Sequence, residues 1–217
     1  MNKVISVSQA MDFVKEGMTL MYGGFMGVGT PEILMDGLRS KNVRNLTVIG
    51  NDAAVPEKGI AKVISNGQVK RLIASHIGLN PEIATLMNSG KLEVELVPQG
   101  TLSERIRCGG AGIGGFLTPT GLGTEVENGK QKLAVGGKDY LLELPLRADV
   151  AFIRGSIVDT MGNVYYRGTT QNFNPLVAMA ADLVIVAAEK VVEPEELTPE
   201  WIMTPAVFVD YIVEGEC

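Results

Sequence analysis

The residues of this chain that are best suited to contact a ligand are glycines, which are concentrated in two runs. The first run occupies residues 22–32, reads YGGFMGVGTPE, and leads from a strand-like segment into a helix-like one. Glycines before a helix start let the main chain approach a ligand closely and direct N–H groups at an anion or a carbonyl oxygen. A tight strand-to-helix turn that binds nothing explains the spacing equally well. The glycine patterns of dinucleotide folds and of P-loops are both missing.

The second run covers residues 108–116 and reads CGGAGIGGF, with five glycines between positions 109 and 115. So much glycine raises the conformational entropy that folding must overcome. We therefore expect a loop at residues 109–116 that closely contacts a ligand or a neighbouring chain. A flexible surface loop is the alternative.

Three side chains outside these runs are weaker candidates for a functional role. His76 is the only histidine and follows a predicted strand, so it could act as a base. Without a paired Ser or Cys motif, a hydrogen-bonded structural role is favoured. Arg105 and Arg107 could contact phosphates or a partner chain, but an ion pair with Glu104 or another neighbour is the favoured interpretation.

Composition narrows the classes of function. Twenty-five acidic and nineteen basic residues give a net charge of −6, which argues against nucleic acid as a partner. Cys108, Cys217 and one histidine support neither a disulfide framework nor a metal site, so we expect reduced thiols without a role. No apolar run reaches the length of a membrane span, and the N-terminus lacks the apolar core of a signal peptide. These features predict a cytoplasmic protein.

Short apolar runs alternate with helical patterns along most of the 217 residues. The alternation predicts one α/β domain over residues 1–217, with a mostly parallel sheet and flanking helices. Strands are expected at residues 19–22, 46–49, 69–74, 92–97, 150–153 and 183–186. Helices are expected at residues 8–16, 31–40, 81–88, 102–107 and 176–181.

The pattern changes between residues 121 and 144. Residues 124–126 and 131–135 flank Asn128-Gly129, which predicts a hairpin, and Gly136-Gly137 predicts a second turn. We expect a small antiparallel insertion in the sheet architecture and not a separate domain.

Several motifs follow one another along the chain. Gly-Gly-Phe, three residues, Gly, one residue and Pro stand at residues 23–31. The other segments are VPQGTL at 97–102, ERIR at 104–107, GGAG at 109–112, TPTG at 118–121 and NFNP at 172–175. Together they resemble the α chain of class I coenzyme A (CoA) transferases over nearly the whole chain. This resemblance implies the fold shared by CoA transferases and NagB- or RpiA-like sugar-phosphate isomerases.

The resemblance also implies an activity and a partner. Such enzymes move CoA between short-chain carboxylic acids, here of the acetate, acetoacetate or butyrate class, through a glutamyl-CoA thioester on a β chain. That glutamate stands in a Ser-Glu-Asn-Gly context, so no catalytic residue is expected in this chain. Glu127 opens an isolated Glu-Asn-Gly tripeptide, which a hairpin turn explains more simply. The resemblance further implies an α2β2 assembly, acyl-CoA as substrate and no tightly bound cofactor.

Site residues follow from the same resemblance. The expected CoA contacts, made largely by main-chain amides, are Gly23, Gly24, Phe25, Met26, Gly27, Val28 and Gly29. The expected substrate-pocket residues are Asn51, Gln99, Gly112, Gly114 and Gly115. Asn51 and Gln99 follow predicted strand ends, where open α/β sheets bind ligands, although hydrogen bonding within loops is the alternative.

Two other functions stay open at this point. A sugar-phosphate isomerase on the same scaffold would need an acid–base pair within this chain, and no convincing pair is present. A non-catalytic subunit that binds acyl-CoA as a signal would need no such pair. The acyl group itself is not determined, because one methylene more or less changes binding by only about 1–3 kcal/mol.

Overall fold

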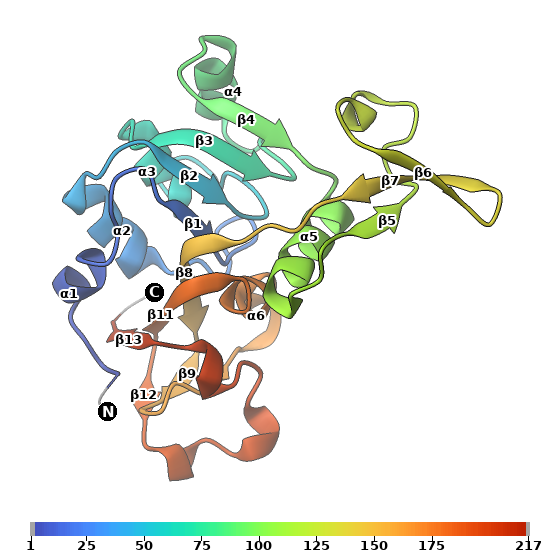
Figure 1. Ribbon diagram of the computed structural model, residues 1–217. Coiled ribbons are helices and arrows are strands. Elements are labelled where there is room, and N and C mark those ends of the chain that lie inside the picture. Colours follow the sequence, from blue (N-terminus) through green and yellow to red (C-terminus); the bar gives the residue numbers. More distant parts are fainter. Residues whose placement is uncertain (1–2, 216–217) are drawn as a thin grey trace.

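A seven-stranded parallel sheet forms the centre of the computed structural model, which describes residues 3–215 (Figure 1). In spatial order the strands are β13 (Tyr211–Glu214), β11 (Ala181–Ala188), β8 (Ala148–Gly155), β1 (Thr19–Tyr22), β2 (Leu46–Ile49), β3 (Val69–Ala74) and β4 (Glu93–Leu96). All neighbouring pairs in this sheet are parallel. The predicted α/β class is therefore confirmed, and each of the six predicted strands is present. Strand β13 was not predicted.

Helices cover both faces of this sheet. They are α1 (Val7–Met11), α2 (Glu32–Lys41), α3 (Ile60–Ser65), α4 (Pro81–Asn88), α5 (Gln99–Ala111) and α6 (Asn174–Ala178). Buried residues of α1 to α4 belong to one apolar cluster, and those of α5 and α6 belong to a second cluster on the opposite face. No helix among residues 3–215 combines the length and the apolar character that crossing a bilayer requires.

The central strands are buried on both faces. In β1, Leu20 and Tyr22 pack with the cluster under α2, while Met21 between them packs with the cluster under α5. Alternate residues of a strand point to opposite faces, so a strand covered on both sides has an unbroken apolar run. This pattern made the strands recognisable in the sequence.

Three predicted helices differ from the structure by more than one residue at their ends. The helix expected at 102–107 is longer and runs from Gln99 to Ala111. The helix expected at 8–16 ends at Met11, because Phe13 and Val14 leave the helix and Phe13 stacks on Tyr211 with ring centroids 4.6 Å apart. Helix α3 was not predicted. The helix expected at 176–181 ends at Ala178, and Ala181 already begins β11.

A three-stranded antiparallel sheet extends away from the body of the molecule (Figure 1). We call it the arm; its strands are β5 (Phe116–Thr118), β7 (Lys138–Glu143) and β6 (Lys132–Val135), in spatial order. The predicted antiparallel insertion is thus confirmed. Its hairpin turns at Gly136-Gly137, where both residues have positive φ, of 59° and 76°.

The predicted hairpin around Asn128-Gly129 is wrong. The 3₁₀ helix η1 (Glu125–Glu127) replaces its first strand, since the Thr124 hydroxyl accepts the Val126 amide at 3.2 Å and starts a helical turn. Local capping outweighed the turn signal of the Asn-Gly pair.

Short elements complete the chain. A small sheet contains β10 (Val164–Tyr165), β9 (Ile157–Asp159) and β12 (Val191–Val192). The remaining 3₁₀ helices are η2 (Gly168–Thr170), η3 (Pro194–Glu196), η4 (Pro199–Trp201) and η5 (Ala206–Phe208).

Much of the second glycine run is helix and not the loop that we expected at 109–116. Gly109 and Gly110 lie in the last turn of α5, and a Cβ on Gly109 would lie 1.9 Å from the carbonyl oxygen of Leu146. A Cβ on Gly110 would lie 2.8 Å from the carbonyl oxygen of Met179. These two glycines therefore allow α5 to pack closely on neighbouring segments. Gly112 ends the helix in the left-handed conformation, with φ of 68°.

An ion network connects the arm to the sheet. Glu95 of β4 accepts hydrogen bonds from Arg71 at 2.6 Å and from Arg105 at 2.9 Å. Arg105 also donates to the carbonyl oxygen of Leu144, which follows the arm. Arg105 is thus a structural ion-pair residue, as favoured from the sequence. Arg107 forms the expected pair with Glu104, at 3.0 Å.

We expect this network to make the protein sensitive to acid. Burial raises the pKa of Glu95, but hydrogen bonds from Arg105 and Arg71 outweigh it, so the net pKa is lowered. A lowered pKa stabilises the fold above the unfolded value of about 4.3, and this stabilisation is lost as the pH falls through the folded pKa. In urea titrations from pH 6 to pH 3, Glu95→Gln should give a smaller acid-induced loss of unfolding free energy than the wild type. Glu104→Gln, at an exposed pair, should follow the wild type, and parallel curves for all three proteins would contradict the expectation.

Candidate functional site

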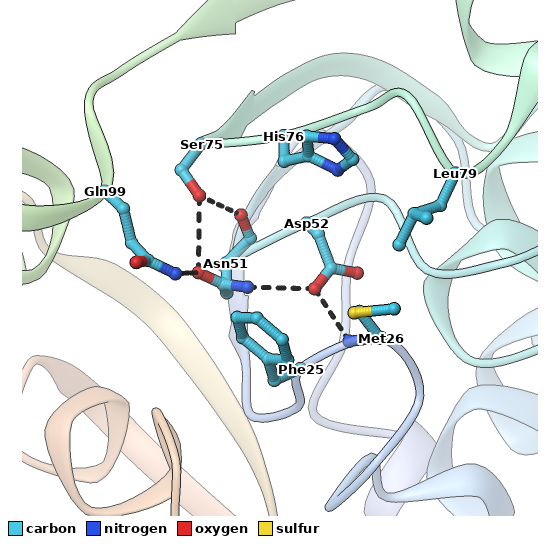
Figure 2. Close-up of a pocket in the computed structure, with 8 residues that line it drawn as sticks. All are labelled: Phe25, Met26, Asn51, Asp52, Ser75, His76, Leu79 and Gln99. Atoms are coloured by element: carbon cyan, nitrogen blue, oxygen red, sulfur yellow. Dashed lines mark hydrogen bonds between the residues drawn. The ribbon is translucent and has the colours of Figure 1, made fainter.

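The candidate site lies at the carboxyl ends of four adjacent strands. The loops that follow β1, β2, β3 and β4 border a cavity of about 370 Å³ (Figure 2). Its lining residues are Phe25, Met26, Asn51, Asp52, Ser75, His76, Leu79 and Gln99. Ligands of open α/β sheets bind at this edge.

Hydrogen bonds join the polar side chains of the cavity. The amide nitrogen of Gln99 donates to Oδ1 of Asn51 at 2.7 Å, and Nδ2 of Asn51 donates to Oδ2 of Asp52 at 2.9 Å (Figure 2). The Ser75 hydroxyl donates to the carbonyl oxygen of Asn51 at 2.7 Å. The structure therefore brings together Asn51 and Gln99, the two polar residues predicted for the pocket, and also gives them the internal bonding that was the alternative.

Tyr22 and Asp52 were not among the predicted site residues. The hydroxyl of Tyr22 donates to the Asp52 carbonyl oxygen at 2.6 Å. The Tyr22 ring packs directly on Gly50, where an added Cβ would lie only 2.3 Å from a ring atom. Burial, and then the Asp52 charge, raise the pKa of Tyr22 well above its ordinary value, so the hydroxyl stays a proton donor. The only available signal was the polar pair Asn51-Asp52 directly after a buried strand.

The first glycine run forms a tight turn at residues 25–28. The amide of Phe25 donates to the carbonyl of Val28, and the amide of Val28 donates to the carbonyl of Phe25, both at 2.9 Å. Met26 and Gly27 have positive φ, of 52° and 86°, as a type I′ turn requires. The left-handed conformation costs a non-glycine residue about 1–2 kcal/mol, so Met26 is strained.

Most main-chain amides of this run are already used. Gly23 donates to the Phe152 carbonyl, Gly24 to Oδ1 of Asn172 and Met26 to Oδ2 of Asp52, at 2.8–3.0 Å. The amides of residues 25 and 28 bond within the turn. This corrects the picture of bare amides along residues 23–29. Within the described chain two amides of the run form no hydrogen bond, those of Gly27, at the tip of the turn, and of Gly29.

Two asparagines hold the run from the opposite side. Asn174 is fully buried; its Nδ2 donates to the carbonyls of Gly29 and Thr170 at 2.9 and 2.8 Å, and its Oδ1 accepts the Arg154 amide at 2.9 Å. Asn172 donates to the Val28 carbonyl at 2.9 Å. The segment NFNP therefore supports the glycine run structurally.

A second cavity, of about 470 Å³, borders the same turn. Its lining residues are Phe25, Val28, Gly168, Thr169, Gln171 and Asn172. Because Phe25 lines both cavities, the turn at 25–28 forms a wall between them.

His76 lines the first cavity, and its carbonyl oxygen accepts the Ala53 amide at 3.2 Å (Figure 2). Its imidazole forms no hydrogen bond with residues 3–215, so the predicted hydrogen-bonded structural role of this side chain is not confirmed. Ser75 donates its hydroxyl to a main-chain carbonyl and not to His76. These two neighbours therefore do not form a nucleophile–base pair.

The other predicted pocket glycines lie away from this cavity. Gln99 begins α5, whereas Gly112, Gly114 and Gly115 follow its other end. A 13-residue helix places its ends roughly 18 Å apart at 1.5 Å per residue. Neither cavity described above includes these glycines, so their role in a substrate pocket stays a prediction.

Two further predicted features have structural explanations. Glu127 lies in the arm, where it accepts the Gly123 amide at 2.7 Å and pairs with Lys132 at 2.6 Å, and these partners lower its pKa. Cys108 is a buried free thiol, and Cys217 lies outside the described residues.

Known proteins resemble this chain over almost its full length. Residues 4–215 match the family model described as coenzyme A transferase. An acetoacetyl-CoA:acetate/butyrate CoA transferase α subunit from Clostridium acetobutylicum is 56% identical over 213 residues, which cover 98% of both chains. An acetate CoA-transferase subunit α from Escherichia coli K12 is 54% identical over 99% of this chain and 97% of its own.

Solved structures share the fold. An acyl-CoA transferase from E. coli O157:H7, in a thioester complex with CoA, gives a TM-score of 0.85 at 24% identity, covering 99% of this chain and 47% of its own. Glutaconate CoA-transferase from Acidaminococcus fermentans gives 0.85 at 20% identity, covering 98% of this chain and 75% of its own. With the family model matched from residue 4 to residue 215, the chain belongs to the coenzyme A transferase family.

Proposed function

We propose that the chain is the α subunit of a two-chain enzyme that moves CoA between a short-chain acyl-CoA and a free carboxylate. The observation that carries the proposal is the likeness over 98% of the chain to a relative named for acetoacetyl-CoA, acetate and butyrate. That relative and the one from E. coli K12 are both named as α subunits, which supports a β-chain partner. The α2β2 arrangement and the cytoplasmic location remain parts of this proposal.

The nucleophile is proposed to come from the partner. Asp52 is the one carboxylate among the lining residues of the first cavity, and both of its oxygens already accept hydrogen bonds. The Ser75 hydroxyl is also committed, and His76 has no nucleophile beside it. A glutamate of the β chain would attack the thioester and form an acyl-glutamyl anhydride with release of CoA thiolate. The thiolate would then attack the glutamyl carbonyl of the anhydride, which releases the first carboxylate and leaves a glutamyl-CoA thioester. Each step exchanges one acyl bond for another, so no oxidant or reductant is needed.

The run at residues 23–29 is proposed to contact the CoA thioester. Phe25, Met26 and Val28 expose 41%, 48% and 45% of their surfaces along the two cavities, and the Gly27 amide is open at the tip. Apolar walls with a few directed donors are typical of small-molecule sites. No Lys or Arg lines either described cavity, which gives no support to a phosphate-gripping isomerase.

Reconstitution tests the proposal. The chain, a β chain that contains Ser-Glu-Asn-Gly and is encoded beside it, and their mixture would each be assayed with acetoacetyl-CoA and acetate or butyrate. Transfer is expected in the mixture alone. Incubation with acyl-CoA followed by mass spectrometry should find a CoA adduct on the β chain only. Activity of the isolated chain, or a CoA adduct on it, would refute the proposal that the nucleophile belongs to the β chain.

The Glu-Asn-Gly tripeptide of this chain offers a specific check. Because Glu127 serves the arm and lies outside both cavities, Glu127→Gln should leave kcat within about twofold of wild type in the reconstituted enzyme. A loss comparable to removal of the β-chain glutamate would identify Glu127 as a second nucleophile. Circular dichroism of the variant would verify that the arm remains folded.

A further inference from the structure

The turn at residues 25–28 has a strained backbone conformation, and a contact from outside the turn holds it there. Met26 has φ of 52°, and 48% of its surface is exposed, so packing of its own side chain does little to keep it there. Its amide donates to Oδ2 of Asp52 at 2.8 Å, and both residues line the first cavity (Figure 2). This bond ties the turn to the loop after β2.

Both oxygens of the Asp52 carboxylate are occupied by hydrogen bonds within the protein. Oδ2 also accepts Nδ2 of Asn51 at 2.9 Å, and Oδ1 accepts the Ala54 amide at 2.7 Å. Asp52 is 5% exposed, so these are charge-assisted bonds in a largely water-free place, where they are strong. With donors on both oxygens, the group is poorly placed to accept a substrate proton.

We propose that Asp52 is a positioning residue of the transferase site. By accepting the Met26 amide it holds the turn in its left-handed conformation and thereby fixes Phe25, which lines both cavities. The consequence for catalysis rests on the proposed function, whereas the effect on the turn does not. If the residues of the turn favoured the type I′ conformation by themselves, loss of the Asp52 carboxylate would have a smaller effect.

The first test removes the acceptor. Asp52→Ala removes both carboxylate oxygens, so the Met26 amide, the Ala54 amide and the Asn51 side chain all lose their acceptor. Misplacement of a site wall by about 1 Å can cost 10²-fold, so kcat of the reconstituted enzyme should fall about 10–100-fold. The KM for acyl-CoA should change less, because the apolar walls remain.

The second test repeats the substitution in a Met26→Asn background. Asn-Gly is the preferred pair of a type I′ turn, so this background should keep the turn without Asp52. There the loss of kcat caused by Asp52→Ala should shrink to within about threefold. An equal loss in both backgrounds would overturn the proposal and assign Asp52 a direct role toward the ligand.

A third measurement needs no activity. In the isolated chain, Asp52→Ala should speed hydrogen exchange of the Met26 amide, followed by NMR, at least about 10-fold. Asp149→Ala is the matched control, because that carboxylate lies outside the site, where it accepts the main-chain amide of Thr19 at a distance of 2.7 Å. It should leave exchange at Met26 unchanged. Unchanged exchange in Asp52→Ala would refute the proposal. If the wild-type mixture proves inactive, the function fails while exchange still decides the role of Asp52.

Discussion

Gly23→Ala is expected to abolish transferase activity and to destabilise the chain. A Cβ at position 23 would lie 1.8 Å from Oδ1 of Asn174, far inside van der Waals contact. Asn174 is fully buried and bonds three main-chain groups, so it cannot move aside without breaking those bonds. We expect a loss of about 3 kcal/mol in the free energy of unfolding and more than about 100-fold in kcat. Urea titration and the reconstituted assay measure the two effects.

Gly100→Ala is the matched control for that substitution. A Cβ on Gly100 meets no atom within 4 Å, and the residue lies in the first turn of α5. Alanine suits a helix better than glycine by roughly 0.5–1 kcal/mol, so stability should stay or rise slightly and activity should persist. If Gly23→Ala behaved like this control, the close approach of Gly23 to Asn174 would be shown to contribute neither to stability nor to activity.

Asn174→Ala is expected to have an effect of similar size on stability, for the opposite reason. It removes a side chain and leaves the Gly29 carbonyl, the Thr170 carbonyl and the Arg154 amide without their buried partner. Each unsatisfied group costs about 1–3 kcal/mol, so we expect a total loss of about 3–5 kcal/mol after partial relaxation. Differential scanning calorimetry and urea titration should agree. Asn128→Ala, at an exposed residue of the arm, should change stability by less than about 0.5 kcal/mol.

Combining the two substitutions tests their common cause. With alanine at position 174, a methyl group at position 23 has room, so Gly23→Ala should cost at least about 1 kcal/mol less than in the wild type. Additive effects would show that the two residues act independently. Asp at position 174 should not restore stability, because it lacks the NH₂ that Gly29 and Thr170 require.

Much of the fold could be predicted because its signals are local. The strand predicted at 19–22 coincides with β1, and the helix predicted at 81–88 coincides with α4, which Asn80 caps and Pro81 begins. Apolar runs and caps act within a few residues, so they can be recognised before the chain is folded. The glycine run at 22–32 and the motifs of the transferase family are local in the same sense.

The errors arose where long-range contacts or competing local bonds decide the outcome. Glycines in the last turn of α5 look like a loop in the sequence, yet Gly109 and Gly110 make room for Leu146 and Met179. At the Asn-Gly pair 128–129, a capped 3₁₀ turn forms in place of the predicted hairpin, and the hairpin of the arm turns at Gly136-Gly137.

By itself the sequence determined the alternating α/β architecture, the family and the glycine run that faces the site. Only the tertiary structure decided which amides of that run remain open and what holds it in place. The reason is the strand order β8-β1-β2, which places the run between the loop after β2 and the residues at the start of α6. Gly29 and Asn174 are 145 residues apart, and no periodicity within either segment records their hydrogen bond.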